Sequence, residues 1–558
     1  MPFLAKEHIP IPTKDILSWM YDDPVYDQDT PVFIDAHDPS VSISAAHAKT
    51  LIRQLVAGFR KAGVEEGDTV LLHSFNNLYY PVIVLGIIGC GANFCGTNPS
   101  YTTGELNHTI RTSQARIIIC DPDVLGDSVT NAAKQCGIPA SNLFVLDSGP
   151  TTPKPSTFKG FASWRALLTH GEQDWLRFDS EEKSRNTTAF LCFSSGTTGL
   201  PKAAQLSHYN LIAEHVLVFQ HRPHPYPRRR LIALPMFHAA TAPSTHISAL
   251  KAGHVNVIMR RYDPSIFMHL IPKFAITDLV LVPPQVTSLL ALPLSVTEKK
   301  AHLSSVRCVW GGGAPLDAVT QNAFSAFLPS STPFTQIWAM TETSCFASLT
   351  PYPEKDNTGS MGIFLPNIDV KILDDAGTDI SAFDVRGELA IRGPTVTRGY
   401  LGRARDADFD HEGYFRTGDV LYCNKETGKW YIVDRKKELI KVRGFQVAPA
   451  EVEGVLLECP GVADVAVLGV KNKGGDSEMV RAYVVRKEGW SEGAINAGND
   501  EEKTISQEDV KRWVEGRLAK YKWLEGGVRF LDSLPKTASG KILKRVLREG
   551  EAREGAKL

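Results

Sequence analysis

The sequence predicts an α/β protein. We expect a large N-terminal body of layered α/β subdomains, a small antiparallel barrel-like subdomain, and a smaller α+β C-terminal domain. Two observations predict this fold class. Short, continuous apolar runs alternate with helical patterns in the N-terminal part, which is typical of buried parallel strands joined by helices. Near residue 360 the runs become shorter, with turn residues between them, which indicates twisted antiparallel strands.

The elements of the N-terminal body follow in order along the chain. Helical patterns at 79–92 and 128–137 separate apolar runs of strand type, and the same strand signal recurs to residue 313. The runs with that signal lie at 68–75, 115–121, 142–147, 229–238, 254–260, 277–284 and 305–313.

The C-terminal part contains a different set of elements. Strands are expected at 369–377, 386–394, 429–438, 462–470 and 479–489, helices at 448–462 and 506–519, and a surface loop at 493–506. We place the domain boundary at 434–437, between an N-terminal domain of residues 1–433 and a C-terminal domain of residues 438–558.

Composition excludes several functions. The 61 basic and 62 acidic side chains almost cancel, so the chain has no bulk attraction for nucleic acid or anionic membranes. The nine cysteines include no C-x-x-C pair, so neither a zinc site nor a disulfide framework is indicated, and a reducing compartment is expected. No apolar signal-peptide run and no transmembrane segment are expected.

One loop combines the residue types that bind phosphate. "SSGTTGLPK", Ser194 to Lys202, follows the apolar run "AFLCF". Glycines allow the backbone to approach a ligand, amide and hydroxyl groups donate to phosphate oxygens, and lysine adds a charge. A flexible surface loop is the alternative reading, because loops favour the same residues. The G-x-x-x-x-G-K-[ST], G-x-G-x-x-G and G-x-S-x-G patterns are absent.

Further segments decide between these readings. The chain contains, in order, "LPMFHA" (234–239), "GGGAPL" (311–316), "IWAMTET" (337–343), "GELAIRGP" (387–394), "YFRTGD" (414–419), "VDRKKELIKVRGFQVAPAEVE" (433–453) and "LPKTASGKILKR" (534–545). Together with "SSGTTGLPK" they resemble the adenylate-forming superfamily of acyl- and aryl-CoA synthetases. The segment 437–453 is most similar to 4-coumarate–CoA ligases of plants and fungi.

The resemblance implies an acid–thiol ligase. ATP would convert a carboxylic acid to an acyl-adenylate with release of pyrophosphate, and the thiol of coenzyme A would then displace AMP. Glu342 would hold Mg²⁺. Other residues would contact the nucleotide or coenzyme A: Ser194, Ser195, Gly196, Thr197, Thr198, Gly199, Lys202, Arg261, Ala314, Gln336, Trp338, Thr341, Asp419, Arg435, Lys437, Arg443 and Gly444.

Catalysis, by the same resemblance, uses two faces of a mobile C-terminal domain. Lys541 would bridge the carboxylate and the α-phosphate during adenylation, and Lys441 and Gln446 would face the site during thioester formation. The segment 434–437 would be the hinge, with Lys437 at the pivot. His238 would lie beside the reacting carboxylate. The nucleotide site departs from the usual pattern at three residues: Ala203 replaces a glycine after Lys202, Trp338 replaces a tyrosine, and Ala339 replaces another glycine.

The acid pocket is expected to be apolar, with an aromatic face. Ala240 replaces a common tyrosine, and Trp310 replaces a lysine or methionine. We therefore expect an aryl, arylalkanoic or medium-chain acid, although Trp310 could instead pack the core behind the glycine loop. The residues expected to line the pocket are His238, Ala240, Ser244, Trp310, Gly313, Ala339, Met340 and Cys345.

Other functions remain open at this point. A stand-alone adenylating enzyme that loads a carrier protein is the main alternative, followed by a luciferase-like oxygenase and a non-catalytic binding protein. The chain ends in Ala556–Lys557–Leu558, similar to the peroxisomal signal S-K-L. We therefore expect binding to a peroxisomal import receptor and a peroxisomal location, or otherwise a cytoplasmic one.

Overall fold

The computed structural model describes residues 1–147, 157–194, 201–314, 316–436, 438–442, 445–471, 478–493, 503–537, 540 and 542–555, the side chains of 157, 445, 446 and 552–555 excepted. The chain divides into two compact units, each described here by itself. The large unit comprises residues 3–370 and 391–415, and the small unit comprises residues 1–2, 371–390 and 416–558. The α/β fold class predicted from the sequence is confirmed.

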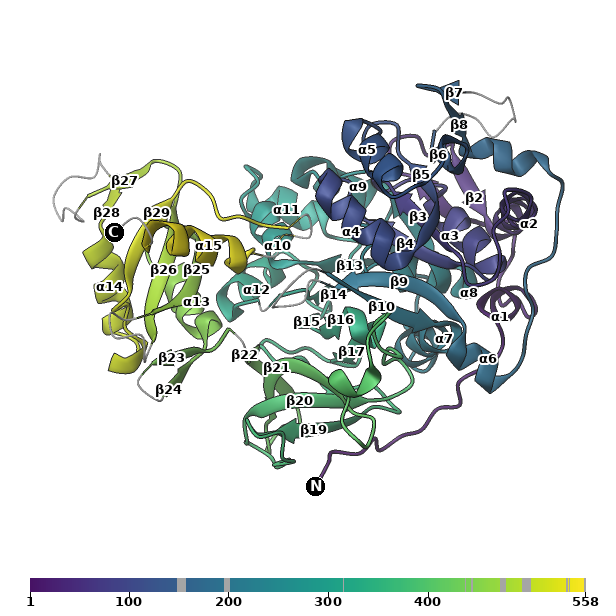
Figure 1. The fold of residues 1–558 in the computed structure, drawn as a ribbon. Coiled ribbons are helices and arrows are strands. Elements are labelled where there is room, and N and C mark those ends of the chain that lie inside the picture. The colour runs from purple at the N-terminus through teal and green to yellow at the C-terminus, as the bar shows by residue number, and fades with distance from the viewer. Residues whose placement is uncertain are drawn as a thin grey trace. The chain divides into compact units, whose positions relative to one another are not determined.

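An eight-stranded sheet forms one layer of the large unit (Figure 1). Its central strands are parallel, and an antiparallel strand closes each edge. The order is β10 (Lys202–Ser207), β9 (Thr188–Ser194), β4 (Asn93–Thr97), β3 (Thr69–His73), β5 (Ala115–Cys120), β6 (Leu143–Val145), β8 (Phe161–Ser163) and β7 (Thr157–Phe158).

A seven-stranded sheet forms a second layer, and one of its strands carries Trp310 of the predicted acid pocket. It is parallel except at β2. The order is β15 (Phe334–Gln336), β14 (Cys308–Gly311), β13 (Asp278–Leu281), β11 (Arg229–Ile232), β12 (Val255–Ile258), β1 (Pro31–Asp35) and β2 (Ser42–Ser44).

Successive side chains of a strand point to opposite faces of its sheet. Both faces of each sheet carry apolar side chains, and helices cover both of them. Ile117 and Ile119 of β5 belong to a core between the two sheets, together with α2 (Ala45–Lys61), α3 (Tyr80–Gly89) and α7 (His208–His215). Ile118 belongs to an outer core with α4 (Thr103–Ser113) and α5 (Asp127–Gln135). The other outer core contains α9 (Pro264–Lys273), α10 (Pro283–Leu290) and α12 (Ala318–Ser325). The large unit is therefore layered as helix, sheet, helix, sheet, helix.

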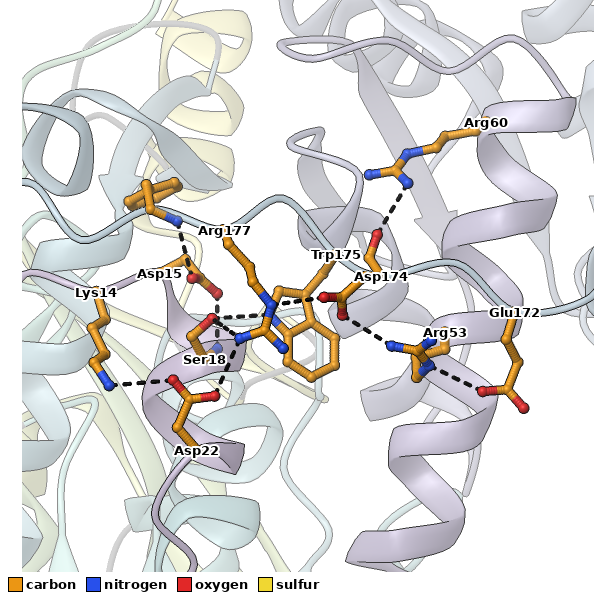
Figure 2. A network of polar contacts seen from close by, with 11 residues as sticks. Lys14, Asp15, Ser18, Asp22, Arg53, Arg60, Glu172, Asp174, Trp175 and Arg177 are labelled. Carbon is orange, nitrogen blue, oxygen red and sulfur yellow. Dashed lines mark hydrogen bonds and ion pairs between the residues drawn. The ribbon is translucent and has the colours of Figure 1, made fainter.

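A connecting segment, residues 172–177, contacts two helices of this unit (Figure 2). The buried Trp175 indole donates to Ser18 Oγ on α1 (Ile16–Tyr21) at 3.0 Å. Arg53 on α2 pairs with Glu172 and Asp174, each at 3.0 Å. These contacts hold the connection between the β7–β8 hairpin and β9 against the body.

The start of the large unit pairs with a distant segment. Phe3 and Val370 exchange backbone hydrogen bonds of 2.9 and 3.0 Å. The Asn367 carboxamide accepts from Ile9 N–H at 2.7 Å and donates to the Ile9 carbonyl at 2.8 Å. The N-terminal residues are thus an integral part of the fold.

A three-stranded sheet continues the large unit beyond residue 337. It has the order β16 (Trp338–Met340), β17 (Cys345–Leu349) and β18 (Ile363–Phe364), all antiparallel. A single turn of 3₁₀ helix, η5 (Thr341–Thr343), joins β16 to β17. This turn carries two of the predicted ATP-site residues.

The C-terminal part begins with a four-stranded sheet, β19 (Asp369–Leu373), β20 (Gly387–Arg392), β21 (Phe415–Cys423) and β22 (Trp430–Arg435). The remaining small unit is α+β, as the sequence predicts. Its elements are β23 (Ile440–Val442), β24 (Phe445–Val447), α13 (Pro449–Leu457), β25 (Val462–Lys471), β26 (Glu478–Arg486), β27 (Trp490–Glu492), β28 (Lys503–Ile505), α14 (Gln507–Glu515), β29 (Gly527–Leu531) and α15 (Lys544–Gly555).

One sequence expectation is wrong in this part. Residues 503–505 were expected to belong to a loop, but they form strand β28, which pairs with β27 in parallel. The buried Ile505 explains the difference, since its side chain packs into the core of the small unit. The two compact units do not divide at 434–437, and this boundary stays a prediction. None of the described helices is long and apolar enough to cross a bilayer.

Candidate functional site

The predicted phosphate loop connects two paired strands. β9 and β10 are antiparallel, and Ser194 at the end of β9 lies opposite Lys202 at the start of β10. The intervening predicted residues Ser195, Gly196, Thr197, Thr198 and Gly199 lie outside the described residues. The alanine that replaces a glycine, Ala203, is buried, and its carbonyl accepts from Leu401 N–H at 2.9 Å. A methyl group is therefore accommodated at this position.

Four polar side chains converge beside the ends of these strands, and Tyr400 is central to them. The Tyr400 hydroxyl donates to Glu342 Oε1 at 2.6 Å and also hydrogen-bonds Ser194. The Lys202 ammonium lies 4.7 Å from the centre of the Tyr400 ring and 3.7 Å from Asp408 Oδ1. Burial and the Glu342 carboxylate raise the pKa of Tyr400, so its hydroxyl remains a donor.

Glu342 has the surroundings of a metal-binding carboxylate. Its side chain is only 5% exposed, and the Thr397 N–H donates to its backbone carbonyl at 2.7 Å, which fixes the 3₁₀ turn. Tyr400 engages Oε1 and thereby orients Oε2. One carboxylate together with phosphate oxygens suits Mg²⁺. Thr341, the preceding residue, is half-buried on the same turn.

Gln336 supports the glycine loop. Its Oε1 accepts from Leu316 N–H at 3.1 Å, and its Nε2 donates to the Leu316 carbonyl at 2.8 Å and to Gln321 Oε1 at 3.0 Å. These contacts fix the end of the loop that exposes Gly313 and Ala314. Trp338 is buried, and its ring meets Phe364 edge to face with centroids 6.0 Å apart. Contacts of Gln336, Ala314 and Trp338 with adenine remain predictions.

His238 is held by the turn that it begins. Its Nδ1 accepts from Ala240 N–H at 3.1 Å, so a neutral ring carries its proton on Nε2. Ser244 is buried at the start of a π-helical turn, η4 (Ser244–Ser248), and its hydroxyl donates to the Thr241 carbonyl at 3.2 Å. The loop from 238 to 244 is therefore internally hydrogen-bonded.

The predicted pocket residue Cys345 and its neighbour Ser344 have unusual backbone geometry. Ser344 and Cys345 have φ values of +59° and +117°, and the latter conformation is rare for a residue with a side chain. The Ser344 hydroxyl donates to the Thr395 carbonyl at 2.8 Å, which helps to hold the turn. Ala339 and Met340, just before η5, are half-buried.

Trp310 lies in an aromatic cluster. Its ring is 5.3 Å from Phe346 and 6.2 Å from Phe219, measured between centroids, and it is 5% exposed. The Arg228 guanidinium lies 5.0 Å from both the Trp310 and Phe219 rings. These contacts fit either a pocket wall or a core residue, so the role of Trp310 stays a prediction.

The small unit brings together two predicted nucleotide residues. Asp419 and Arg435 are opposite each other on β21 and β22, and Arg435 Nε lies 3.3 Å from Asp419 Oδ1. On β23 and β24, Lys441 lies opposite Gln446, and the Lys441 side chain is exposed. The Gln446 side chain and residues Lys437, Arg443, Gly444 and Lys541 lie outside the described residues.

Arg261, predicted to meet coenzyme A phosphates, is exposed on the large unit. Its guanidinium stacks 3.7 Å from the centre of the Phe75 ring. An exposed guanidinium on an aromatic support can still bind an anion.

Sequence reasoning missed Tyr400 and Asp408. Neither stands in a segment with a recognisable pattern, and their contacts with Glu342 and Lys202 arise only because residues 397–408 fold back onto β10. Tyrosine after glycine in "RGYLG" gave no signal beyond that of a turn.

Comparisons with known proteins find similar chains over nearly the whole sequence. The family model "AMP-binding enzyme" matches residues 24–401, and "AMP-binding enzyme C-terminal domain" matches residues 451–541. The chain is 47% identical to acyl-CoA ligase azaF of Aspergillus niger, covering 98% of this chain and all of that protein. It is 46% identical to phenylacetyl-CoA ligase epaB of Aspergillus niger, covering 98% and 99%. The crystal structure of ATP-bound MatB from Rhodopseudomonas palustris matches with a TM-score of 0.80 and 25% identity, covering 96% of this chain and 98% of that one.

Proposed function

Since the chain belongs to the AMP-binding enzyme family of adenylate-forming proteins, we propose that it is an ATP-dependent acyl-CoA ligase. The observation that carries this proposal is the convergence of Ser194, Lys202 and Glu342 around Tyr400. This arrangement combines a cation, a hydroxyl and an oriented carboxylate at the ends of the strands that flank a glycine-rich loop.

The first half-reaction makes a mixed anhydride. An oxygen of the substrate carboxylate attacks the α-phosphorus of ATP, the bond from this phosphorus to the bridging oxygen breaks, and pyrophosphate leaves. Lys202 and the loop 195–199 would bind the β- and γ-phosphates, and Thr341 the α-phosphate. Mg²⁺, held by Glu342, would offset phosphate charge. Positioning and fixed charge supply such catalysis.

The second half-reaction transfers the acyl group. The sulfur of coenzyme A attacks the acyl carbon, the bond to the AMP oxygen breaks, and the thiol proton goes to solvent. Lys541 would serve the first half-reaction, while Lys441 and Gln446 would serve the second after rotation about 434–437. Arg443, Gly444 and Arg261 would contact coenzyme A, and Asp419 and Arg435 the ribose. The two family models leave residues 402–450 unmatched, and this interval contains the proposed hinge.

The acid is an aryl, arylalkanoic or medium-chain acid, of the kind used by 4-coumarate–CoA ligase-like enzymes. The aromatic neighbours of Trp310 support this, as does the name of the phenylacetyl-CoA ligase relative. Loading of a carrier protein, the alternative acceptor, has no support from the relatives, whose names are those of CoA ligases.

A panel of carboxylic acids tests the function. Purified protein with ATP, Mg²⁺ and coenzyme A should form AMP, pyrophosphate and an acyl-CoA from at least one aryl, arylalkanoic or medium-chain acid. Thioester formation on a carrier protein but not on coenzyme A would contradict the proposal, and so would the absence of any adenylate.

The terminal Ala556–Lys557–Leu558, outside the described residues, is proposed to direct the protein to peroxisomes through their import receptor. A fluorescent protein fused to the N-terminus should appear in puncta with a peroxisomal marker, and deletion of residues 556–558 should make it diffuse. A full-length fusion that is already diffuse in cells with normal peroxisomes would refute this.

A further inference from the structure

A row of polar side chains crosses the inner face of the seven-stranded sheet. Strand register places Asn256, Arg230, Asp278 and Cys308 side by side on β12, β11, β13 and β14. All four are buried, with Asn256 0% and Arg230 4% exposed. Residues two positions along the same strands, such as Ile232, belong to the core between the sheets. We call these four residues the polar row.

The polar row carries one positive charge without a partner carboxylate. Arg228 Nε lies 3.1 Å from Asp278 Oδ1, which neutralises that carboxylate. Burial lowers the pKa of His224, of His254 and, to about 3, of His215, so these three imidazoles are neutral. Arg230 keeps its charge, because burial lowers its pKa only to about 10. In the described part of the chain no carboxylate forms an ion pair with Arg230.

Four side-chain atoms of the polar row have no hydrogen-bond partner among the described residues. They are Arg230 Nη1, both polar atoms of the Asn256 carboxamide, and Asp278 Oδ1, whose charge the Arg228 ion pair neutralises. Each such buried atom destabilises the folded state if nothing satisfies it. Neighbouring strands therefore present a charged donor, a neutral donor and an acceptor to the same interior space.

The polar row lies beside residues of the predicted acid pocket. Trp310 lies two residues beyond Cys308 on β14, which is about 7 Å along the strand. Val280, beside Trp310 on β13, is only partly buried, although its strand lies inside the sheet. Burial raises the pKa of the Cys345 thiol, and Arg230 lies close enough to oppose that shift. Trp310 and Cys345 are both residues expected to contact the acid.

The polar row does not suit a metal ion. Ligand atoms of His224, Asp278 and Cys308 lie within 4.8 Å of one another. However, the Arg228 guanidinium lies against His224, 2.8 Å from its Nε2, and pairs with Asp278. The positive charge of the Arg228 guanidinium would repel a metal cation bound by these atoms. The chemistry of the row is that of a donor site for oxygen.

We propose that Arg230 and Asn256 bind an oxygen acceptor at the far end of the acid substrate. The acid would carry a carbonyl or a second carboxylate, which lies beyond Trp310 while the reacting carboxylate lies near His238. This inference rests on the proposed ligase function and narrows its substrate class. Apolar contacts along Trp310 would bind the middle of the acid, and the polar row would select its end.

Matched acids test the proposal with the unmodified enzyme. For chains of six, eight and ten carbons, kcat/KM is measured for the plain alkanoate, the acid with a ketone next to its terminal methyl, and the dicarboxylate. Phenylacetate and 4-acetylphenylacetate form an aromatic pair. We expect at least one acceptor-bearing acid to exceed its plain counterpart tenfold or more. No such preference at any length would overturn the proposal.

Variants then assign the preference to the row. Arg230→Met and Asn256→Leu should each remove most of it, while the KM for ATP stays within about twofold. Arg229→Met is the matched control, since this neighbouring guanidinium donates to the Phe274 carbonyl at 2.7 Å and lies outside the row. If Arg230→Met keeps the preference, Arg230 does not bind the acceptor, and the proposal is wrong.

The result also separates this inference from the proposed function. Turnover of plain acids without any preference overturns the polar row alone, whereas the absence of thioester from every acid overturns both.

Discussion

Tyr400 provides the sharpest test of the ATP site. Tyr400→Phe removes the hydroxyl that donates to Glu342 at 2.6 Å but keeps the ring beneath the Lys202 ammonium. A hydrogen bond to a charged group contributes about 1.5–3 kcal/mol. At about 1.4 kcal/mol per tenfold change in rate, we expect adenylation to slow by roughly 10- to 100-fold. The loss should come with a higher Mg²⁺ requirement, because Glu342 is no longer oriented.

The assay is acid-dependent exchange of pyrophosphate into ATP over a range of Mg²⁺ concentrations. Thioester formation from a supplied acyl-adenylate should remain near the wild-type rate. Tyr262→Phe is the control, since it loses a comparable 2.7 Å contact with Ser288 away from Glu342. An exchange rate and Mg²⁺ dependence equal to those of the wild type would refute the role of Tyr400.

Three further changes test other parts of the scheme. Lys541→Ala should reduce adenylate formation by about 10²–10³-fold and spare thioester formation from supplied adenylate; equal loss of both steps would contradict the two-face scheme. Trp310→Ala should shift the preferred acid toward bulkier chains with little change in the KM for ATP; an unfolded protein, seen by circular dichroism, or an unchanged acid ranking would make Trp310 a core residue. Burial raises the pKa of Asp434 from 3.8 to about 6, so this group makes the folded state less stable as pH rises from 4 to 6. Asp434→Asn should remove that dependence and raise the free energy of unfolding at pH 7.5 by roughly 1–2 kcal/mol, measured by urea denaturation. A shift of about two pKa units allows at most about 3 kcal/mol. Asn can still accept from Ala450 N–H, and a lower free energy of unfolding would refute the sign.

The periodicity of the sequence predicted the layers well, but it could not predict which residues of neighbouring strands lie side by side. The run "ARIIIC" indicates a buried strand, and β5 indeed alternates Ile117 and Ile118 between two cores. The run beginning at Arg229 was read in the same way, yet Arg230 lies buried on the inner face beside Asn256. Strand signals do not specify register, so a row made of four separate segments is invisible in the sequence.

The candidate site was predictable to a similar extent. Motif resemblance located Ser194, Lys202 and Glu342, whose positions depend on local turns. It did not locate Tyr400, whose partners lie 58 residues away and farther, because tertiary contacts of a turn residue leave no local signature.

The pairing of the first residues with residues 367–370 has a consequence for synthesis. Ile9 and Asn367 are separated by 358 positions, so the N-terminal segment leaves the ribosome long before its partner exists. At 5–20 residues per second the delay is about 20–70 s. During that time the leading segment has unpaired backbone groups that chaperones or other nascent chains could engage. Residues 3–9 can thus reach their native place only after residues 367–370 have been synthesised.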